Sequence, residues 1–459
     1  MPALDLCIIG FGISGIATTR WAKAQGLRFV TLEREAEGGG VWITKSYPGV
    51  ILQTTKHSYS FSDMPMSEET PLHPGGDDLL NYFNDYIRYH RLDSHIQYRC
   101  EVVSIPHRTG DYHRVMYRDL KRGRLETLHA RNLAICSGFY THPKWAPDID
   151  LRPFRGTSLH ISDLSPTGKA KNYNFKGKRV LVIGNGPSGC DTAIRAVQEG
   201  ARHVDLVFRS PRWIFTRYCG LLGLNFFSNR FFLWIATKLP ASLFIAILYT
   251  LFYIPYYLSG AHHNLQLPKE VVNRNNLTLH ESFMIYLNLK KFRYLQPKEV
   301  VLDGHRARYH YDTHSEETVD IDVVISATGY HIGIPFLGLH EIPNLYKRCL
   351  VVNDPTVAFI GFAPSFNWIQ VADLQARWFI KSIVGENRIP PFHEREEELN
   401  RELRRYETIP YEYNDLAYIA YIYCDDLSAD LGIVSHSHKT WGHWWRVPRH
   451  DEWAGFKRS

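Results

Sequence analysis

The sequence lacks the cysteine patterns that mark disulfide scaffolds and zinc sites. Its 459 residues contain seven cysteines, an odd number, and no two of them are spaced as a CxxC or CxxxxC pair. Scattered cysteines of this kind are typical of thiols kept reduced inside the cell. We therefore expect an intracellular protein without structural disulfides and without a bound metal ion.

Strong charge of one sign and a secretion signal are also missing. The 53 Lys and Arg residues against 47 Asp and Glu residues give a net charge of +6, and no basic stripe interleaved with aromatic side chains is present. This weak basic bias does not favour nucleic acid as a partner. The apolar N-terminal stretch leads into a glycine-rich motif, so we expect no secretion signal. A hydrophobic share of 44% indicates a globular chain.

Long hydrophobic runs are scarce, and one stands out. Residues 239–258 carry no charge, which matches the ~20 residues needed to cross a bilayer. Pro240 and Pro255 interrupt the run, and a span would separate two parts of one domain. We expect a hydrophobic helical insertion at 213–263 that lies on a membrane surface from the cytoplasmic side. Helices packed on the domain, or a homodimer interface, are the alternatives. The basic residues expected to meet anionic headgroups are Arg217, Arg230 and Lys238.

A dinucleotide-binding fingerprint opens the chain. A predicted strand at 5–9 leads into GFGISG at 10–15, a helix at 16–25 and a strand at 27–32 that closes on Glu33. The glycines allow a tight turn and close approach of a pyrophosphate to the first N–H groups of the helix, and the acid accepts from a ribose hydroxyl. The expected cofactor-binding residues are Gly10, Gly12, Ser14, Gly15 and Glu33.

The same pattern returns 174 residues later. A strand at 178–183 precedes GNGPSG at 184–189, a helix at 190–198 and a strand at 204–208. This strand ends in Arg209 and Ser210 instead of an acid, which suits a 2′-phosphate and predicts NADP. Solvated loop charges are the alternative for Arg209 and Arg212. The expected cofactor-binding residues are Gly184, Gly186, Ser188, Gly189, Arg209 and Ser210.

Two dinucleotide sites in one chain predict a bound flavin and an exchanging nicotinamide, and hence hydride transfer between them. Buried-type strands at 322–326 and 356–360 are both expected to join the first sheet. The predicted fold class is therefore α/β, with two Rossmann-like dinucleotide-binding domains and the hydrophobic helical insertion. The FAD-binding domain would comprise 1–165 and 321–459, with the NADP-binding domain inserted at 166–320.

Further motifs follow in an order that resembles the flavin-containing monooxygenases over nearly the whole chain. GGVW at 39–42 is similar to that family's GGxW element, FRGTSLH at 154–160 to its FxGxxxH linker signature, ATGY at 327–330 to its ATGY segment and DLQAR at 373–377 to its ELQAR helix start. His160 is expected to order the linker rather than to exchange protons. Core packing is the alternative for Trp42. The cofactor-binding residues that the resemblance implies are Gly40, Val41, Trp42, Thr328, Gly329 and Gln375.

The resemblance also implies the reaction. NADPH would reduce FAD, O2 would add to the reduced flavin, and the resulting C4a-hydroperoxide would oxygenate a soft nucleophile, N or S, of a small and lipophilic substrate. Ten residues before Asp63, the family's active-site Asn position holds Gln53, the expected catalytic residue. Leu164 and Ser165 stand where the Baeyer–Villiger type has Trp-Pro, so oxygenation of a carbonyl is the less well matched alternative. A non-oxygenating, membrane-associated protein that binds FAD and NADP is the other.

Overall fold

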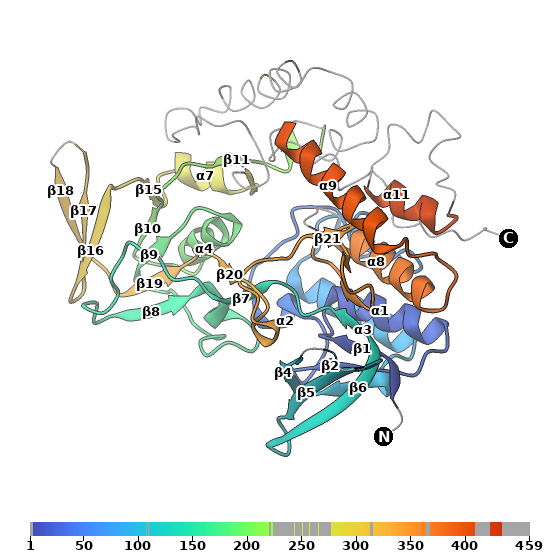
Figure 1. The fold of residues 1–459 in the computed structure, drawn as a ribbon. Helices are drawn as coiled ribbons and strands as arrows, with labels where there is room; N and C mark the ends of the chain where they lie inside the picture. The colour runs from blue at the N-terminus through green and yellow to red at the C-terminus, as the bar shows by residue number, and fades with distance from the viewer. Residues whose placement is uncertain are drawn as a thin grey trace. The chain divides into compact units, whose positions relative to one another are not determined.

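The chain folds into two compact units, each built on its own largely parallel sheet (Figure 1). The computed structural model describes residues 3–106, 108, 110–219, 222, 223, 243, 250, 257, 265, 277–312, 315–363, 368–408 and 423–433. Unit 1 comprises 1–43, 54–141 and 332–459, and unit 2 comprises 44–53 and 142–331. The chain passes between the units on either side of segment 44–53 and again in β7 (Tyr140–Pro143) and β20 (Tyr330–Ile332).

Unit 1 contains a nine-stranded sheet in which β23, β6, β1, β2 and β3 run parallel. Its central strand is β1, whose residues Leu6 to Ile9 are buried on both faces, as parallel strands covered by helices must be. Strands β5 and β4 continue from β6 as antiparallel neighbours. The strands are β1 (Leu4–Ile9), β2 (Phe29–Glu33), β3 (Ile96–Tyr98), β4 (Cys100–Ser104), β5 (His113–Asp119), β6 (Arg124–Ile135), β21 (Leu345–Tyr346), β22 (Leu350–Val351) and β23 (Val357–Phe359).

The helices of unit 1 include α1 and α8, which pack against each other. Helix α8 buries most of its length, whereas the glutamate-rich α9 is largely exposed, as its charge pattern predicts. The helices are α1 (Ile13–Ala24), α2 (Val41–Thr44), α3 (Gly76–Tyr89), α8 (Trp368–Ile383), α9 (Phe392–Thr408) and α11 (Tyr423–Asp430), with short 3-10 turns at Asp93–His95 and Pro335–Leu337.

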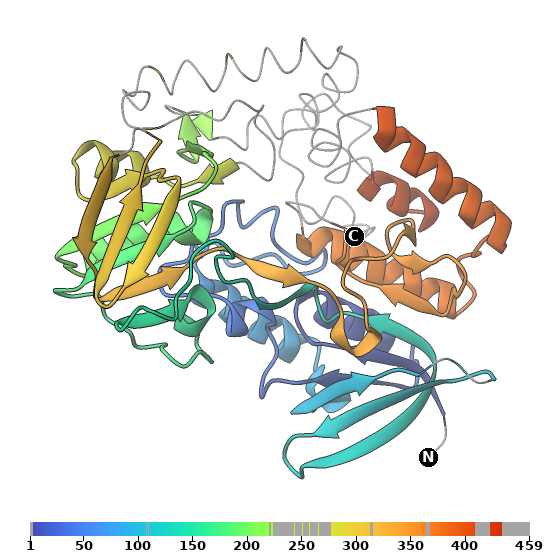
Figure 2. The ribbon, with the colours of Figure 1, turned by 60° about the vertical axis from the view of Figure 1, so that its left-hand side comes forward.

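Unit 2 contains a five-stranded parallel sheet in the order β15-β10-β9-β19-β8, against which α4 packs. Strands β16 to β18 form a separate antiparallel layer, drawn in yellow in Figure 2. The elements are β8 (Thr157–His160), a 3-10 turn (Ile161–Leu164), β9 (Arg179–Ile183), α4 (Pro187–Gln198), β10 (His203–Val207), β11 (Trp213–Phe215), β12 (Tyr218–Cys219), β13 (Leu222–Gly223), β14 (Leu277–Leu279), α7 (Phe283–Asn288), β15 (Arg293–Leu295), β16 (Glu299–Asp303), β17 (Arg306–His310), β18 (Glu316–Asp320) and β19 (Val323–Ser326).

The strand expected at 322–326 joins a different sheet from the one predicted. Strand β19 pairs with β9 and β8 in unit 2, whereas β23, the strand expected at 356–360, lies in the sheet of unit 1 as predicted. Both sheets contain strands that are buried on two faces, so an apolar run alone does not show which sheet a strand will join. The expected domain boundaries at 165 and 320 shift accordingly: residues 142–165 and 321–331 belong to unit 2, together with the short segment 44–53.

The expected hydrophobic insertion falls largely outside the described residues. Between 220 and 276 the structure describes only six positions. Among the residues it does describe, no helix combines the length and the apolar character needed to cross a membrane. Arg217, expected to meet lipid headgroups, is instead buried beside Glu281.

Candidate functional site

The first glycine-rich turn connects β1 to α1 and requires glycine at two positions. Gly10 has a φ of +96°, and a Cβ there would lie 2.8 Å from the Cys136 carbonyl oxygen. A Cβ on Gly15 would lie only 2.0 Å from the Gly10 carbonyl oxygen. Gly12 forms the N-cap of α1, and no side chain caps this helix end. The first N–H groups of α1 therefore remain available to an anion.

The GGVW element meets this turn, as its expected role requires. Gly39 N donates to the Phe11 carbonyl oxygen at 3.0 Å, and Gly40, with a φ of +57°, packs so closely that a Cβ on it would lie 2.9 Å from Gly12 Cα. Val41 is exposed, and the half-buried Trp42 stands edge-on to Tyr59 with ring centroids 6.1 Å apart.

Glu33 lies at the end of β2 beside the first turn. Its Oε2 accepts from Phe11 N at 2.5 Å and its Oε1 from Glu35 N at 2.8 Å. Burial raises the pKa of this carboxyl, and the two backbone N–H groups offset part of that effect. Each carboxylate oxygen can accept a second hydrogen bond, so Glu33 retains the capacity to bind a ribose hydroxyl.

Gln375 supports a second turn that the sequence analysis did not assign to the site. Its Oε1 accepts from Gly361 N at 2.7 Å, while its Nε2 donates to the Arg348 carbonyl oxygen at 3.0 Å and to the Tyr423 hydroxyl at 2.7 Å. Gly361, with a φ of +80°, lies against Ser14 at the start of α1. Both amide N–H groups of Gln375 are therefore engaged within the protein, and the residue positions the Gly361 turn beside α1.

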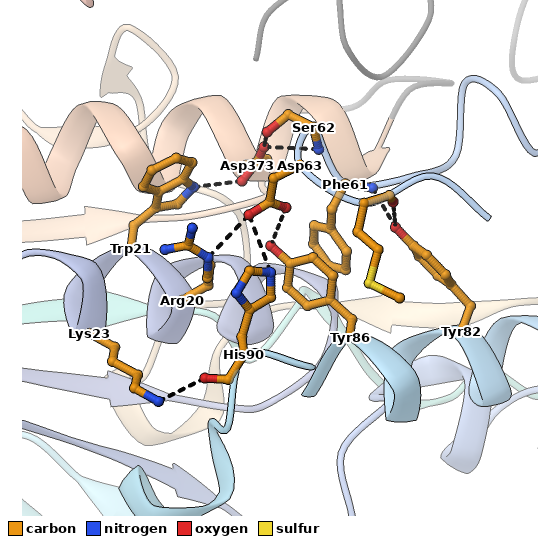
Figure 3. Close-up of polar contacts among 11 residues, drawn as sticks. Arg20, Trp21, Lys23, Phe61, Ser62, Asp63, Tyr82, Tyr86, His90 and Asp373 are labelled. Atoms are coloured by element: carbon orange, nitrogen blue, oxygen red, sulfur yellow. Dashed lines mark hydrogen bonds and ion pairs between the residues drawn. The ribbon is translucent and has the colours of Figure 1, made fainter. Parts of the chain in front are cut away.

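A buried polar network joins α1 to residues 61–63 and α8 (Figure 3). Asp373 accepts from Trp21 Nε1 at 2.6 Å and from the Ser62 hydroxyl. Asp63 accepts from Tyr86 and Arg20 at 2.7 and 3.1 Å. Burial and the charge of Asp63 raise the pKa of Asp373.

The pKa of Asp63, which also pairs with His90 at 3.3 Å, is shifted in the opposite direction. Burial alone would raise the pKa of Asp63, but hydrogen bonds from His90 and Tyr86 and the nearby positive charges lower it overall. The pKa values of the two acids are therefore shifted in opposite directions, and the network joins α1 to α8.

The second glycine-rich turn connects β9 to α4 in the same way. Gly184 has a φ of +108°, and a Cβ on Gly189 would lie 1.7 Å from the Gly184 carbonyl oxygen. In contrast, a Cβ on Gly186 would meet no atom of the described residues within 4 Å, its two chain neighbours aside. Pro187 stands at the first position of α4, Ser188 follows it, and no side chain caps the helix. This turn thus leaves open space directly in front of a helix N-terminus.

Arg209 and Ser210 follow β10 at the carboxyl edge of the second sheet. The Arg209 side chain is 81% exposed and lies 3.5 Å from Asp148, a pair that contributes little to stability. Asn185, inside the glycine-rich turn, donates to the Ser210 carbonyl oxygen at 3.0 Å and to the Tyr294 hydroxyl at 2.8 Å. Arg212 is half-buried, and burial lowers its pKa, so the solvated-loop alternative does not describe it.

Thr328 and Gly329 follow β19 and therefore belong to unit 2. Gly329 has a φ of +84°, and its carbonyl oxygen accepts from Lys144 N at 2.9 Å and lies 3.0 Å from His160 Nε2. Because His160 Nδ1 accepts from Ser162 N, the ring proton is on Nε2 and donates to Gly329. Burial lowers the pKa of His160. The histidine holds the ATGY turn in place, which agrees with its expected ordering role.

Gln53 ends segment 44–53 in unit 2 and is half-buried. Its amide makes no hydrogen bond to another residue in the described part of the chain, so it is available to a ligand. Among the described residues, no cluster of His, Cys, Asp and Glu side chains could hold a metal ion.

The two turns fit two dinucleotides. In each turn, glycines precede a helix N-terminus that has no side-chain cap from its N-cap residue. The strand that follows each helix leads to a group suited to a different ribose, a carboxylate at Glu33 and a guanidinium at Arg209. The residue set therefore fits a flavin dinucleotide in unit 1 and a phosphorylated nicotinamide dinucleotide in unit 2.

Comparisons with known proteins give one consistent result. The family model described as "Flavin-binding monooxygenase-like" matches residues 3–436. Flavin-containing monooxygenase 3 of Oryctolagus cuniculus is 29% identical, over 93% of this chain and 83% of its own length.

Three solved structures share the fold at low sequence identity. S-allyl-L-cysteine S-oxygenase from Allium sativum has a TM-score of 0.64 at 19% identity, covering 98% of this chain and 97% of its own. OTEMO in complex with FAD and NADP scores 0.66 at 17%, with coverages of 88% and 92%. Cyclohexanone monooxygenase scores 0.70 at 15%, with coverages of 96% and 99%.

The family match over nearly the whole chain agrees with the two nucleotide turns and supports FAD and NADPH as the cofactors. The chain belongs to the flavin-binding monooxygenase-like family and is a flavin-dependent monooxygenase.

Proposed function

We propose that this monooxygenase uses NADPH and O2 to oxygenate a soft nucleophile, a nitrogen or sulfur centre, of a small lipophilic substrate. The observation that carries the proposal is the pair of glycine-rich turns with opposite ribose chemistry, Glu33 after the first and Arg209 after the second. Bound FAD, reduced by NADPH, supplies the activation of O2.

The nucleotide specificity depends on Arg209. Its exposed guanidinium pairs, among the described residues, with the exposed carboxylate of Asp148 at 3.5 Å, a weak contact that a 2′-phosphate can replace. A bidentate contact between guanidinium and phosphate would favour NADPH over NADH. The open space in front of Gly186 supports a close approach of the pyrophosphate to α4.

Gln53 is the proposed catalytic residue. Its amide can donate a hydrogen bond to the oxygen that is transferred, and it has no competing partner among the described residues. A donor that acts only on a species formed after O2 has reacted favours oxygen transfer over release of H2O2, without affecting the reduction of the flavin.

The choice of N or S rather than a carbonyl rests on residues 164 and 165. Leu164 and Ser165 are both buried in unit 2, where the Baeyer–Villiger type has Trp-Pro. Oxygenation of a carbonyl is therefore the second candidate. A ketone substrate distinguishes the two because its product is an ester or lactone.

The test uses purified holoenzyme with NADPH or NADH and a panel of tertiary amines, sulfides and cyclic ketones. Oxygenated product is followed by mass spectrometry, together with NADPH consumption and H2O2. We expect N- or S-oxides, with NADPH preferred over NADH. The Gln53→Leu variant should keep fast flavin reduction but divert most oxidant to H2O2.

Three results would contradict parts of this proposal. Lactone without N- or S-oxide supports the carbonyl alternative. H2O2 as the sole product with every substrate supports the non-oxygenating alternative. Equal use of NADH and NADPH, unchanged in Arg209→Ala, removes the role of Arg209.

A further inference from the structure

Segment 44–53 connects the GGVW element to Gln53 and clusters with unit 2. Tyr47 is only 8% exposed and lies in the hydrophobic core of unit 2 with Leu159, Phe175 and Cys190. Val50 packs against the same core, and its N–H donates to the Tyr47 carbonyl oxygen at 3.1 Å. This segment follows the first glycine-rich turn in sequence, but it packs against the core of unit 2, which contains the second turn.

The first polar anchor of the segment is Asp191 on α4. The Tyr47 hydroxyl donates to Asp191 Oδ2 at 2.8 Å, and His280 Nε2 lies 3.2 Å from Oδ1. Because His280 Nδ1 accepts from Ser282 N, Nε2 is the ring nitrogen that carries the proton and lies beside the carboxylate. Burial raises the pKa of Tyr47 and the charge of Asp191 adds to this, so the phenol stays a proton donor. Both oxygens of Asp191 are therefore engaged, one of them by the segment.

The second polar anchor is Arg217. Its side chain is buried, pairs with Glu281, and donates from a terminal nitrogen to the Ile51 carbonyl oxygen at 3.4 Å. Ile51 is two residues before Gln53. A third contact comes from Lys45, whose ammonium lies 5.1 Å from the centre of the Tyr330 ring. The segment is thus held near its start, its middle and its end.

Both polar anchors are contacted by the adjacent residues His280 and Glu281. His280 supports Asp191, the adjacent Glu281 supports Arg217, and both follow β14, which pairs with β11 just before Arg217. Asp191 lies three residues beyond Ser188 on α4, the helix whose N-terminus is the proposed nicotinamide-nucleotide site. The proposed nucleotide site and the segment that ends at Gln53 therefore share α4 as a common support.

We propose that Asp191 and Arg217 are positioning residues that fix segment 44–53 on α4, through Tyr47 and the Ile51 carbonyl, and thereby fix the amide of Gln53 for oxygen transfer. This inference rests on the proposed function of Gln53. Hydrogen bonds to ionised groups hold geometry better than neutral ones, and small misplacement of a catalytic donor is costly.

The test compares two substitutions that remove the same kind of bond from the same unit. Tyr47→Phe removes the hydroxyl that reaches Asp191. Tyr309→Phe removes a buried hydroxyl that donates to Asp205, also at 2.8 Å, between β17 and β10 and without contact to the segment. In both variants of the holoenzyme we would measure hydrogen–deuterium exchange at residues 47–53, the anaerobic rate of flavin reduction by NADPH, and the share of NADPH that yields H2O2.

We expect Tyr47→Phe to raise amide exchange at Val50 about fivefold, the effect of losing one hydrogen bond. The H2O2 share should rise severalfold while the rate of flavin reduction stays unchanged. Asp191→Asn should act in the same direction, and Tyr309→Phe should change none of the three quantities.

Unchanged exchange in Tyr47→Phe would overturn the anchor. Faster amide exchange at residues 47–53 with an unchanged H2O2 share would show that the anchor does not position Gln53 for oxygen transfer. If the unmutated enzyme forms no oxygenated product, or Gln53→Leu leaves the H2O2 share unchanged, the proposed function fails, and the exchange data still report on the anchor by themselves.

Discussion

At the scale of single residues, the glycines of the two fingerprints have different tasks. A Cβ on Gly189 would lie 1.7 Å from a backbone oxygen, so this glycine is required by the fold itself. Among the described residues, and apart from its two chain neighbours, a Cβ on Gly186 would meet no atom within 4 Å, so packing in this part of the structure does not require glycine there. The proposed reason for glycine at 186 is the close approach of the nucleotide.

Gly186→Ala should therefore separate binding from folding. We expect an unchanged melting temperature and a KM for NADPH raised about tenfold or more, because a methyl group would occupy the space of the pyrophosphate. Enzyme kinetics and thermal melts of the same preparation measure both quantities. Gly189→Ala is the contrasting variant, with a lowered melting temperature. An unaltered KM in Gly186→Ala would show that the nucleotide lies elsewhere.

His160 makes stability depend on pH. Burial lowers its pKa below the ordinary value of 6.5, so the unfolded chain binds a proton that the folded chain resists. Stability is then complete above about pH 6.5 and is lost as the pH falls toward the folded-state pKa. His113 and His95, whose pKa values burial also lowers, act in the same direction.

We expect the melting-temperature difference between the unmutated protein and His160→Gln to shrink as the pH falls from about 7 to about 5. Differential scanning fluorimetry at constant ionic strength measures this difference. His393→Gln serves as the control, because that side chain is 77% exposed and should leave the pH profile unchanged. A constant difference for His160→Gln across this range would rule out its contribution.

At the scale of elements, the pairing of α1 with α8 depends on a buried carboxylate. Asp373 is 3% exposed and accepts from Trp21, so Trp21→Phe leaves one of its oxygens without that donor. Trp378 offers a matched comparison, since its indole donates at 3.0 Å to Asp430, whose side chain is 35% exposed and can turn to water.

Trp21→Phe should consequently destabilise the protein more than Trp378→Phe, by about 1–3 kcal/mol, the cost of leaving a buried acceptor unsatisfied. Urea denaturation of both variants measures the two free energies of unfolding. Adding Asp373→Asn to Trp21→Phe should recover part of the loss, because a neutral amide is less costly to bury than a charge. Equal losses in the two single variants would mean that the acid has found another donor.

Element by element, the sequence predicts the local structure well and the assembly less well. Both fingerprints place a strand, a glycine turn and a helix within a few residues of the observed β1–α1 and β9–α4 units. Their signals are local: apolar runs, glycine spacing and a terminal acid or arginine. The strand expected at 322–326 in the first sheet lies in the second, because its apolar side chains can be buried equally well in either sheet.

At the scale of the whole molecule, what sequence could not predict is contact between distant positions. Tyr47 and Asp191 are 144 residues apart, and neither carries a motif that names the other. Gln375 is expected at the cofactor from its motif, and the structure shows that its amide supports the Gly361 turn and contacts Tyr423, 48 residues further on. The turns themselves could be predicted from their motifs, whereas the partners that position a side chain could not, because they lie far away in the sequence.

Membrane association remains a sequence-based prediction for residues 226–258. Apolar side chains contribute about 1.5–3 kcal/mol each on leaving water, so a few suffice for an anchor on one leaflet. With Arg217 buried, Arg230 and Lys238 are the remaining charges expected to meet anionic lipid.

The intact protein should float with anionic liposomes, and a variant with Ile247→Glu, Leu251→Glu and Ile254→Glu should not. Gln97→Glu, Leu125→Glu and Asn400→Glu change the charge equally at exposed sites of unit 1 and should still float. Flotation of all three proteins, or of none without detergent, would refute an anchor in this segment.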